Sequence, residues 1–196
     1  MTVSPLDQLC RDLVQEFERD PKGSGVVRLL GEYATKHDDW REFITHSTER
    51  YTRNLAHRCK HYELLVLAWG EGQESPIHNH DGNSCWMAVL DGELEELHFS
   101  EPGERPNPLI RGRVARYMQG DVGFIQDQIA LHLIRPASGA TGVSLHLYAN
   151  PIDQCRIYDL ETSESELVEL GYCSVRGEPC DRPADEVRAD WAESRA

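Results

Sequence analysis

From Tyr62 onward, the chain is a succession of short segments that are apolar or that alternate between apolar and polar residues. Gly, Pro, Asn and Asp separate these segments, as is typical of residues between strands. Because so many consecutive strands must hide their edges, the sequence predicts a sheet that closes into a small barrel or jelly roll. The expected strands include residues 63–69, 85–90, 94–99, 114–118, 122–125, 129–134, 142–149 and 156–160.

The first fifty residues have a different period. Apolar residues between Leu6 and Phe17 recur at helical spacing, and further helical patterns cover residues 26–36 and 39–45. A chain of 196 residues is long enough for one domain with a sizeable core. We therefore predict one domain over 1–175, made of a helical part at 1–50 that links through 51–55 to a barrel at 51–175, and a charged, loosely ordered tail at 176–196.

Composition excludes several classes of partner. The formal net charge is −14, which argues against binding to nucleic acid or to anionic membranes. No apolar run approaches the roughly 20 residues of a membrane span, and the first residues lack the apolar segment of a secretory signal. The six cysteines form no C-x-x-C pair, which favours reduced thiols. We expect a cytoplasmic monomer that binds a small molecule.

His78 and His80 are candidate metal ligands, because residues i and i+2 of a strand project to the same face. The pair alone is weak, since nine histidines give roughly 0.4 such pairs by chance and surface or packing histidines are common. Its context is stronger. The order of Gly72, His78, His80, Cys85 and Gly92 resembles the first motif of the cupin superfamily, with both glycines where hairpin turns are expected.

That cupin motif usually carries a ligating Glu where this chain has Cys85, so a further ligand is needed downstream. His132, within 129–134, is the candidate, although the Pro-x-Gly that normally precedes it is absent. Three neutral imidazoles suit iron, zinc or copper. They leave the charge of a divalent ion to be met by an anionic ligand such as a thiolate, and only a redox-active metal adds O2 chemistry.

The wider pattern resembles cysteine dioxygenase, the thiol-oxidising branch of the cupins. The match covers about 120 residues, and the last twenty give no clear match. The segments that carry the resemblance are 51–55 (YTRNL), 69–72 (WGEG), 78–85, 129–132 (IALH) and 144–148 (SLHLY), continuing weakly to Asp153 and Cys155.

The resemblance implies a cupin-type fold and assigns roles to individual residues. His78, His80 and His132 correspond to the ligands of Fe(2+), and Arg53 corresponds to the residue that pairs with the substrate carboxylate. A planar guanidinium suits that task because it can make two charge-assisted hydrogen bonds. Without the resemblance, Arg53 would be read as a solvated residue at the start of a strand. Tyr51 and Trp69 are the remaining residues expected at the substrate.

Ser144, His146 and Tyr148 alternate with leucines, so one strand should point all three to the same side. On an interior face they would form a relay that aims the Tyr148 hydroxyl at the substrate; the alternative is an outward polar face with the leucines buried. In the family, the counterparts of Tyr148 and Cys85 form a thioether cross-link. Cys85 is therefore expected to be a cross-link partner and not a metal ligand.

Two positions depart from the family. The animal members have a cis-proline directly after the tyrosine strand, whereas this chain reads Ala149, Asn150, Pro151, so the turn geometry is open. Trp86 follows Cys85 where a smaller aromatic is expected, which predicts an altered pocket wall.

The implied activity is an iron(II) dioxygenase that oxidises L-cysteine with O2 to cysteine sulfinate. Cysteine would bind through its thiolate and amine while Arg53 holds the carboxylate. One alternative is a dioxygenase of 3-mercaptopropionate or mercaptosuccinate, although relatives that prefer mercaptopropionate typically have Gln in place of Arg53. Another is a cupin that binds metal without catalysis.

Overall fold

The structure is a computed structural model, and it describes residues 3–100, 108–180 and 186–187. Its helical elements are α1 (Pro5–Arg19), α2 (Val26–Lys36) and the 3₁₀ turn η1 (Asp39–Phe43). Its strands are β1 (Thr52–Arg58), β2 (Tyr62–Trp69), β3 (Ile77–His78), β4 (Ser84–Ser100), β5 (Ile110–Met118), β6 (Val122–Ile125), β7 (Leu131–Pro136), β8 (Gly142–Ala149), β9 (Gln154–Tyr158), β10 (Ser165–Glu169), β11 (Ser174–Val175) and β12 (Glu178–Pro179).

Helix α1 begins and ends where its capping residues predict. The Ser4 side chain accepts a hydrogen bond from the Asp7 amide at the start of α1, and Pro5 occupies its first turn. The helix ends at Arg19, just before Asp20 and Pro21. The predicted helical N-terminal part is confirmed. In the described part of the chain, no helix has the length and apolar character that crossing a membrane requires.

The sheet has two parts that are joined through β4. One part contains β1, β2, β8, β6 and the first half of β4; the other contains β3, β7, β9, β10, β5 and the second half. The predicted mainly β fold with N-terminal helices on it is confirmed. The expected closure is not, because the path of paired strands has β10 and β12 as its ends among the described residues.

Gly92 corrects one expectation, since it lies inside β4 and not in a hairpin turn. The two strands expected at 85–90 and 94–99 are therefore one strand. Gly92 has a φ of +78°, and a Cβ there would lie 2.4 Å from the carbonyl oxygen of Thr141. The pairing of β4 with β8 shifts register between Val89 and Asp91, so this glycine permits the bulge that carries β4 between the two parts.

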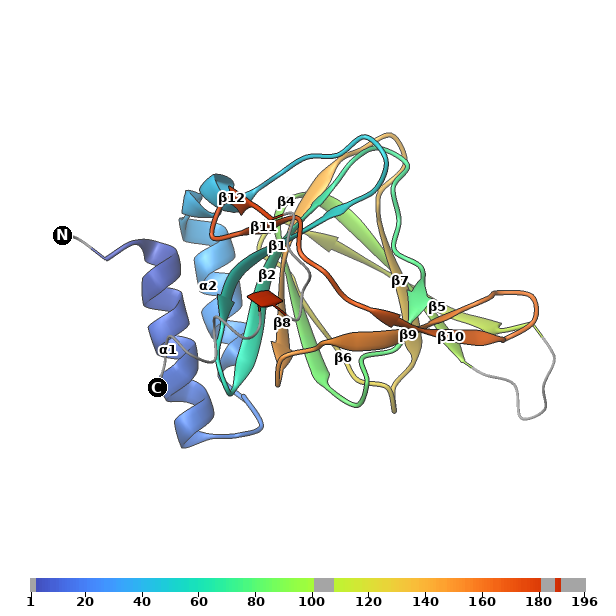
Figure 1. Cartoon of the computed structure of the whole chain (residues 1–196), viewed down its shortest axis with the longest axis horizontal. Coiled ribbons are helices and arrows are strands. Elements are labelled where there is room, and N and C mark those ends of the chain that lie inside the picture. The colour runs from blue at the N-terminus through green and yellow to red at the C-terminus, as the bar shows by residue number, and fades with distance from the viewer. Residues whose placement is uncertain (1–2, 101–107, 181–185, 188–196) are drawn as a thin grey trace.

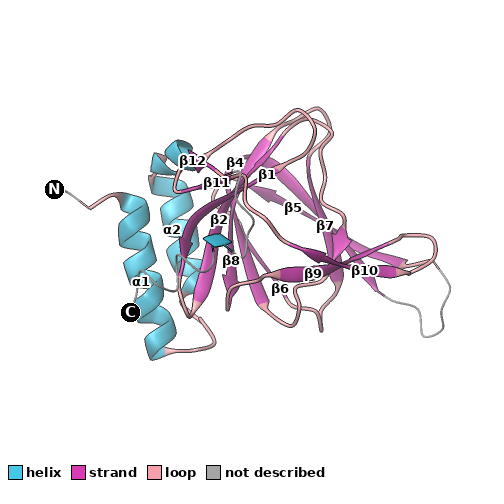
Figure 2. Cartoon of the chain, viewed as in Figure 1, coloured by secondary structure: helices cyan, strands magenta, loops and turns pink. Residues whose placement is uncertain are grey.

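Both faces of the first sheet part are buried. Figures 1 and 2 show α1 and α2 together on one side of β1, β2 and β8. Along β8, Leu145 and Leu147 pack into the apolar layer beneath these helices, whereas Tyr148 packs into the layer between the two sheet parts. The inner layer also holds Leu65 of β2 and Ile134 of β7, so it joins the two parts. The sheet therefore has one side for the helices and an interior side.

The structure differs from the sequence-based expectation in two places: where the chain enters the sheet and in the C-terminal segment. Residues expected to link the helices to the sheet belong to β1, which pairs in parallel with β11, Asn54 opposite Ser174. Within the predicted tail, β12 pairs with β11 and Val187 is buried in the inner layer. These parts of the tail are thus packed against the domain. Residues 181–185 and 188–196 lie outside the described residues, and the division into domain and tail stays a prediction.

Candidate metal centre and substrate pocket

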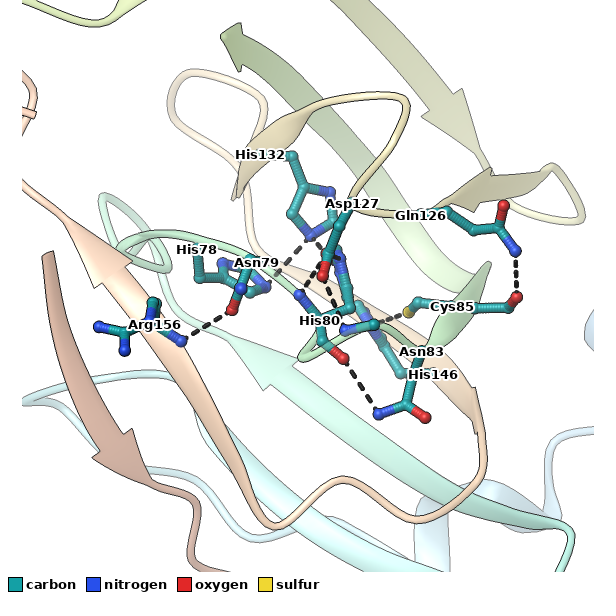
Figure 3. A network of polar contacts seen from close by, with 12 residues as sticks. His78, Asn79, His80, Asn83, Cys85, Gln126, Asp127, His132, His146 and Arg156 are labelled. Carbon is teal, nitrogen blue, oxygen red and sulfur yellow. Dashed lines mark hydrogen bonds and ion pairs between the residues drawn. The ribbon is translucent and has the colours of Figure 1, made fainter. Parts of the chain in front are cut away.

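Three histidines converge at the inner edge of the sheet. His78 of β3 lies directly opposite His132 of β7, and His80 follows two residues after His78. The Nε2 atom of His132 is 3.1 Å from that of His78 and 3.0 Å from that of His80. Figure 3 shows the rings pointing toward one another. The structure thus brings together the three predicted ligands, which form a group that can hold a metal ion.

The spacing of these nitrogens fits a shared metal ion. Imidazole nitrogens bind a transition metal at about 2.1 Å, so two that meet it at right angles are about 3.0 Å apart. At tetrahedral angles the separation would be roughly 3.4 Å. The observed 3.0 and 3.1 Å therefore lie in the range expected for nitrogens that bind one metal ion.

The other nitrogen of each ring has an acceptor beside it. His78 Nδ1 lies 2.9 Å from the Pro76 carbonyl oxygen, and His132 Nδ1 lies 2.8 Å from Oε1 of Glu96. Each Nδ1–H can donate to that oxygen, which leaves the Nε2 lone pair facing the centre. His80 Nδ1 is 3.3 Å from a carboxylate oxygen of Asp127, which also accepts from the His80 amide.

Burial keeps His78 and His132 neutral. It lowers the pKa of His78 to about 3, with the neighbouring charge of His80 acting in the same direction, and it lowers the pKa of His132 well below its usual range. Neutral imidazole is the form that ligates a metal, so these rings are ready for an ion at neutral pH.

Glu96 and Asp127 are functional residues that the sequence reasoning missed. Glu96 is a buried carboxylate on β4, and it also accepts a hydrogen bond from the Tyr117 hydroxyl. The sequence held one indication of this position. Glu96 lies two residues after the apolar Leu94, so both side chains are expected on the same, inward face of the strand. Asp127 lies in a loop, where no periodicity indicates its direction.

The polar face of β8 is interior, as the relay prediction requires. The Trp69 indole donates to Ser144 Oγ at 2.9 Å, and Ser144 Oγ lies 3.0 Å from His146 Nε2. The other ring nitrogen of His146 faces Cys85 Sγ at 4.0 Å. The rings of His146 and Tyr148 stack with centroids 6.2 Å apart. The relay therefore starts at Trp69, and its extension to the Tyr148 hydroxyl stays a prediction.

Cys85 and Tyr148 are cross-strand neighbours. They lie directly opposite each other in the pairing of β4 with β8, and both are buried. Such partners point to the same face of the sheet. Burial raises the pKa of the Cys85 thiol and of the Tyr148 phenol, so both groups are protonated at neutral pH.

A cavity of about 450 Å³ opens beside the histidines. Tyr51, Arg53, His78 and Tyr148 line it, together with residues from 168–173. Trp69 does not line it; its ring stacks behind Tyr51 with centroids 4.5 Å apart. The structure thus places four of the predicted site residues at the cavity and Trp69 one layer deeper.

Arg53 has hydrogen-bonding capacity to spare. Its Nε donates to the Gly171 carbonyl oxygen at 3.3 Å, and its Nη2 is 3.8 Å from a carboxylate oxygen of the buried Glu63. Among the described residues, that Nη2 is buried with no hydrogen-bond partner. A buried guanidinium with an unused donor suits an incoming carboxylate.

The structure shows the position of Trp86 and the turn at Asn150, the two features of the sequence that depart from the family. Trp86 is buried beneath the helices, where it contacts Phe17 and Phe124, so the expected change to a pocket wall is wrong. Asn150 has a φ of +63°, and its amide donates to the His61 carbonyl oxygen. Asn tolerates this left-handed conformation, which is how the chain turns after Tyr148.

Comparisons with known proteins agree with this site. The family model described as Cysteine dioxygenase type I matches residues 1–161. Cysteine dioxygenase type 1 of Danio rerio is 32% identical over 182 residues, covering 91% of this chain and 90% of the relative. The Homo sapiens protein of the same name is 31% identical over 175 residues, covering 88% of each.

Solved structures with a similar fold include two bacterial proteins. One is a protein with a double-stranded beta-helix domain from Klebsiella pneumoniae, at 16% identity and a TM-score of 0.46, covering 69% of this chain and 98% of that one. The other is an RmlC-like cupin protein from Desulfovibrio desulfuricans, at 24% identity and a TM-score of 0.41, covering 60% and 98%. From the family model and its curated relatives, the chain belongs to the cysteine dioxygenase type I family.

Proposed function

We propose that this chain is a non-haem iron(II) dioxygenase that oxidises L-cysteine with O2 to cysteine sulfinate. The observation that carries the proposal is the convergence of His78, His80 and His132, of which His78 lines a cavity that Arg53 also lines. A bound thiol acid can then reach the metal with its sulfur and the guanidinium with its carboxylate. Bound iron(II) would supply the redox step with O2, which zinc lacks.

Arg53 would hold the substrate carboxylate. Its unused Nη2 donor supports this role, and Tyr51 and Tyr148 line the same cavity. Fixing the carboxylate orients the thiol and amine toward the histidines, which lowers the entropic cost of reaching the reactive geometry. The buried Glu63 would keep the guanidinium in place.

Ser144 and His146 would position Tyr148, which lines the cavity. The bonds from Trp69 through Ser144 fix the His146 ring between Cys85 and Tyr148. Burial, together with the charge of Arg53, lowers the pKa of His146 to about 3, so the ring is neutral and can accept a hydrogen bond. We further propose that Cys85 and Tyr148 form a thioether cross-link, which their opposite positions on paired strands support.

We also propose that the protein is a cytoplasmic monomer. All six cysteines are thiols in the structure, as expected in a reducing compartment. Light scattering of the purified chain would test the oligomeric state, because a dimer would have twice the mass of 22.3 kDa.

Substrate choice is tested by replacing Arg53. In Arg53→Ala, we expect KM for cysteine to rise roughly 10- to 150-fold, because a charge-assisted hydrogen bond contributes about 1.5–3 kcal/mol. Oxidation of cysteamine, which has no carboxylate, should be unaffected by the change. O2 consumption with cysteine, cysteamine, 3-mercaptopropionate and mercaptosuccinate measures both effects.

Arg156→Ala is the matched control, since Arg156 is exposed on β9. An unchanged KM for cysteine in Arg53→Ala would remove Arg53 from the substrate site. Preference of the unaltered protein for 3-mercaptopropionate or mercaptosuccinate would assign the activity to a different thiol acid. If the iron-loaded protein consumes no O2 with any of these thiols, metal binding without catalysis would be the remaining function.

A further inference from the structure

A tight hairpin next to the cavity contains two cysteines. Strand β11 (Ser174–Val175) pairs antiparallel with β12 (Glu178–Pro179). The two residues between them, Arg176 and Gly177, have φ values of +50° and +85°. Positive φ at both positions is the pattern of a two-residue type I′ turn, which fixes the register of the flanking strands.

The register places Cys173 opposite Cys180. Counting outward from the turn, Val175 lies opposite Glu178 and Ser174 lies opposite Pro179, so Cys173 and Cys180 are the next two residues. The Cys180 amide also donates to the Cys173 carbonyl oxygen at 2.9 Å, so one backbone hydrogen bond joins the two residues across the hairpin.

The geometry of such a pair suits a disulfide. Directly opposite residues of an antiparallel pair have Cα atoms about 4.5–5.5 Å apart and side chains on the same face. Disulfides form when this distance is about 4.4–6.8 Å. Cys180 packs against the inner layer and Cys173 lines the cavity, which agrees with a shared inward side.

These two cysteines are also the accessible ones. Cys173 and Cys180 are partly exposed, whereas the other four cysteines are buried: Cys10, Cys59, Cys85 and Cys155. A soluble oxidant therefore meets this pair first. In a reducing compartment, a disulfide of this kind is typically transient and redox-sensing.

The pair is connected to the substrate pocket through its backbone. The Cys173 amide donates to the Arg53 carbonyl oxygen at 2.7 Å, and the Gly171 carbonyl oxygen accepts from Arg53 Nε. A bond between Cys173 and Cys180 would therefore restrain the stretch of chain that holds Arg53.

We propose that Cys173 and Cys180 are a redox-active dithiol that forms a reversible disulfide across this hairpin and restrains the pocket wall beside Arg53. With a small-molecule disulfide as oxidant, one cysteine thiolate attacks a sulfur of the oxidant, forming a mixed disulfide and releasing one thiolate. The second cysteine thiolate then attacks the protein sulfur of the mixed disulfide and releases the second thiolate. The protein loses two electrons and two protons, and the small disulfide is reduced to two thiols.

The test treats the iron-loaded full chain with glutathione disulfide under argon, so that no turnover occurs. Peptide mapping by mass spectrometry should find a bond between Cys173 and Cys180, a mass loss of about 2 Da, and the other four cysteines as thiols. Amide exchange of β11 should slow in the oxidised form. Adding cysteine should reverse both changes. Because no activity is measured, the result is independent of the proposed function.

Cys180→Ser is the control, because it can form the mixed disulfide at Cys173 but cannot resolve it. This variant should keep one glutathione adduct and show no mass loss. If the unaltered chain accumulates adducts at Cys173 or Cys180 in the same way, or if Cys173 pairs with Cys155, the proposed dithiol is wrong. If amide exchange of β11 does not slow after the disulfide forms, the proposed restraint of the pocket wall is wrong.

Discussion

The two faces of strand β8 are both buried, yet different physical terms hold them. Leu145 and Leu147 pack beneath the helices among other apolar side chains. Ser144 and His146, which alternate with these leucines in the sequence, face the interior and are held by specific hydrogen bonds that begin at Trp69. An apolar layer accepts many side chains of the right volume, whereas each buried polar atom needs its own partner. Chemistry is therefore expected to depend on the polar face and stability on the apolar one.

The largest expected effect concerns a metal ligand. His132→Ala removes one of three converging nitrogens, so iron content should fall to background and cysteine-dependent O2 uptake should drop by at least about a thousandfold. Metal analysis and an oxygen electrode would measure this. Retained iron and retained turnover would show that the polar interior does not form the metal centre.

The apolar face should give the opposite result. Leu145→Ala leaves a cavity beneath the helices, so the free energy of unfolding should fall by about 2–5 kcal/mol. Turnover per folded molecule should stay the same. Urea unfolding and activity at matched folded fraction would separate the two quantities. A loss of turnover beyond the loss of folded protein would break the division between the faces.

A smaller effect is expected behind the metal. Glu96→Gln removes the carboxylate that accepts a hydrogen bond from His132. Because such partners contribute roughly 10- to 100-fold to metal affinity, the affinity for the metal should fall by a factor of that size. Competition with a chelator measures it. Glu95→Gln is the matched control, because Glu95 is the neighbouring residue and pairs with Arg135 instead. Equal effects of the two substitutions would mean that charge, and not the bond to His132, determines the affinity.

The last expected effect, which is the smallest per pH unit, concerns the stability of the metal-free chain. Burial and the charge of Arg53 lower the pKa of His146 to about 3 from 6.5. The unfolded chain therefore binds more protons below pH 6.5, so stability is lost as pH falls from about 6.5 toward 3.

Replacing His146 should make that loss shallower. For His146→Gln, the slope of unfolding free energy against pH should decrease by about 1.4 kcal/mol per unit. Leu145→Ala should lower the whole curve and keep its slope. Denaturant unfolding at several pH values would compare them, and an unchanged slope in His146→Gln would mean that this ring is not buried as a neutral group.

The same comparison explains how much the sequence could predict. Period alone predicted both helices and that Ser144 shares one side of its strand with His146, and the resemblance to the family selected His132 as the third ligand. It could not predict Glu96 as the partner of His132, because that contact joins two strands 36 residues apart in the chain. The bulge at Gly92 and the parallel pairing of β1 with β11 were missed for the same reason, since pairing between distant segments leaves no local pattern.

Three imidazoles that can hold a metal ion lie beside a cavity that His78 and Arg53 line, and we expect a thiol acid, the metal and O2 to meet there. The most direct measurement is mass spectrometry of the product formed from cysteine in isotopically labelled O2 by the iron-loaded chain. The account predicts cysteine sulfinate that carries both labelled oxygen atoms. A product with one labelled atom or none, such as cystine, would contradict it.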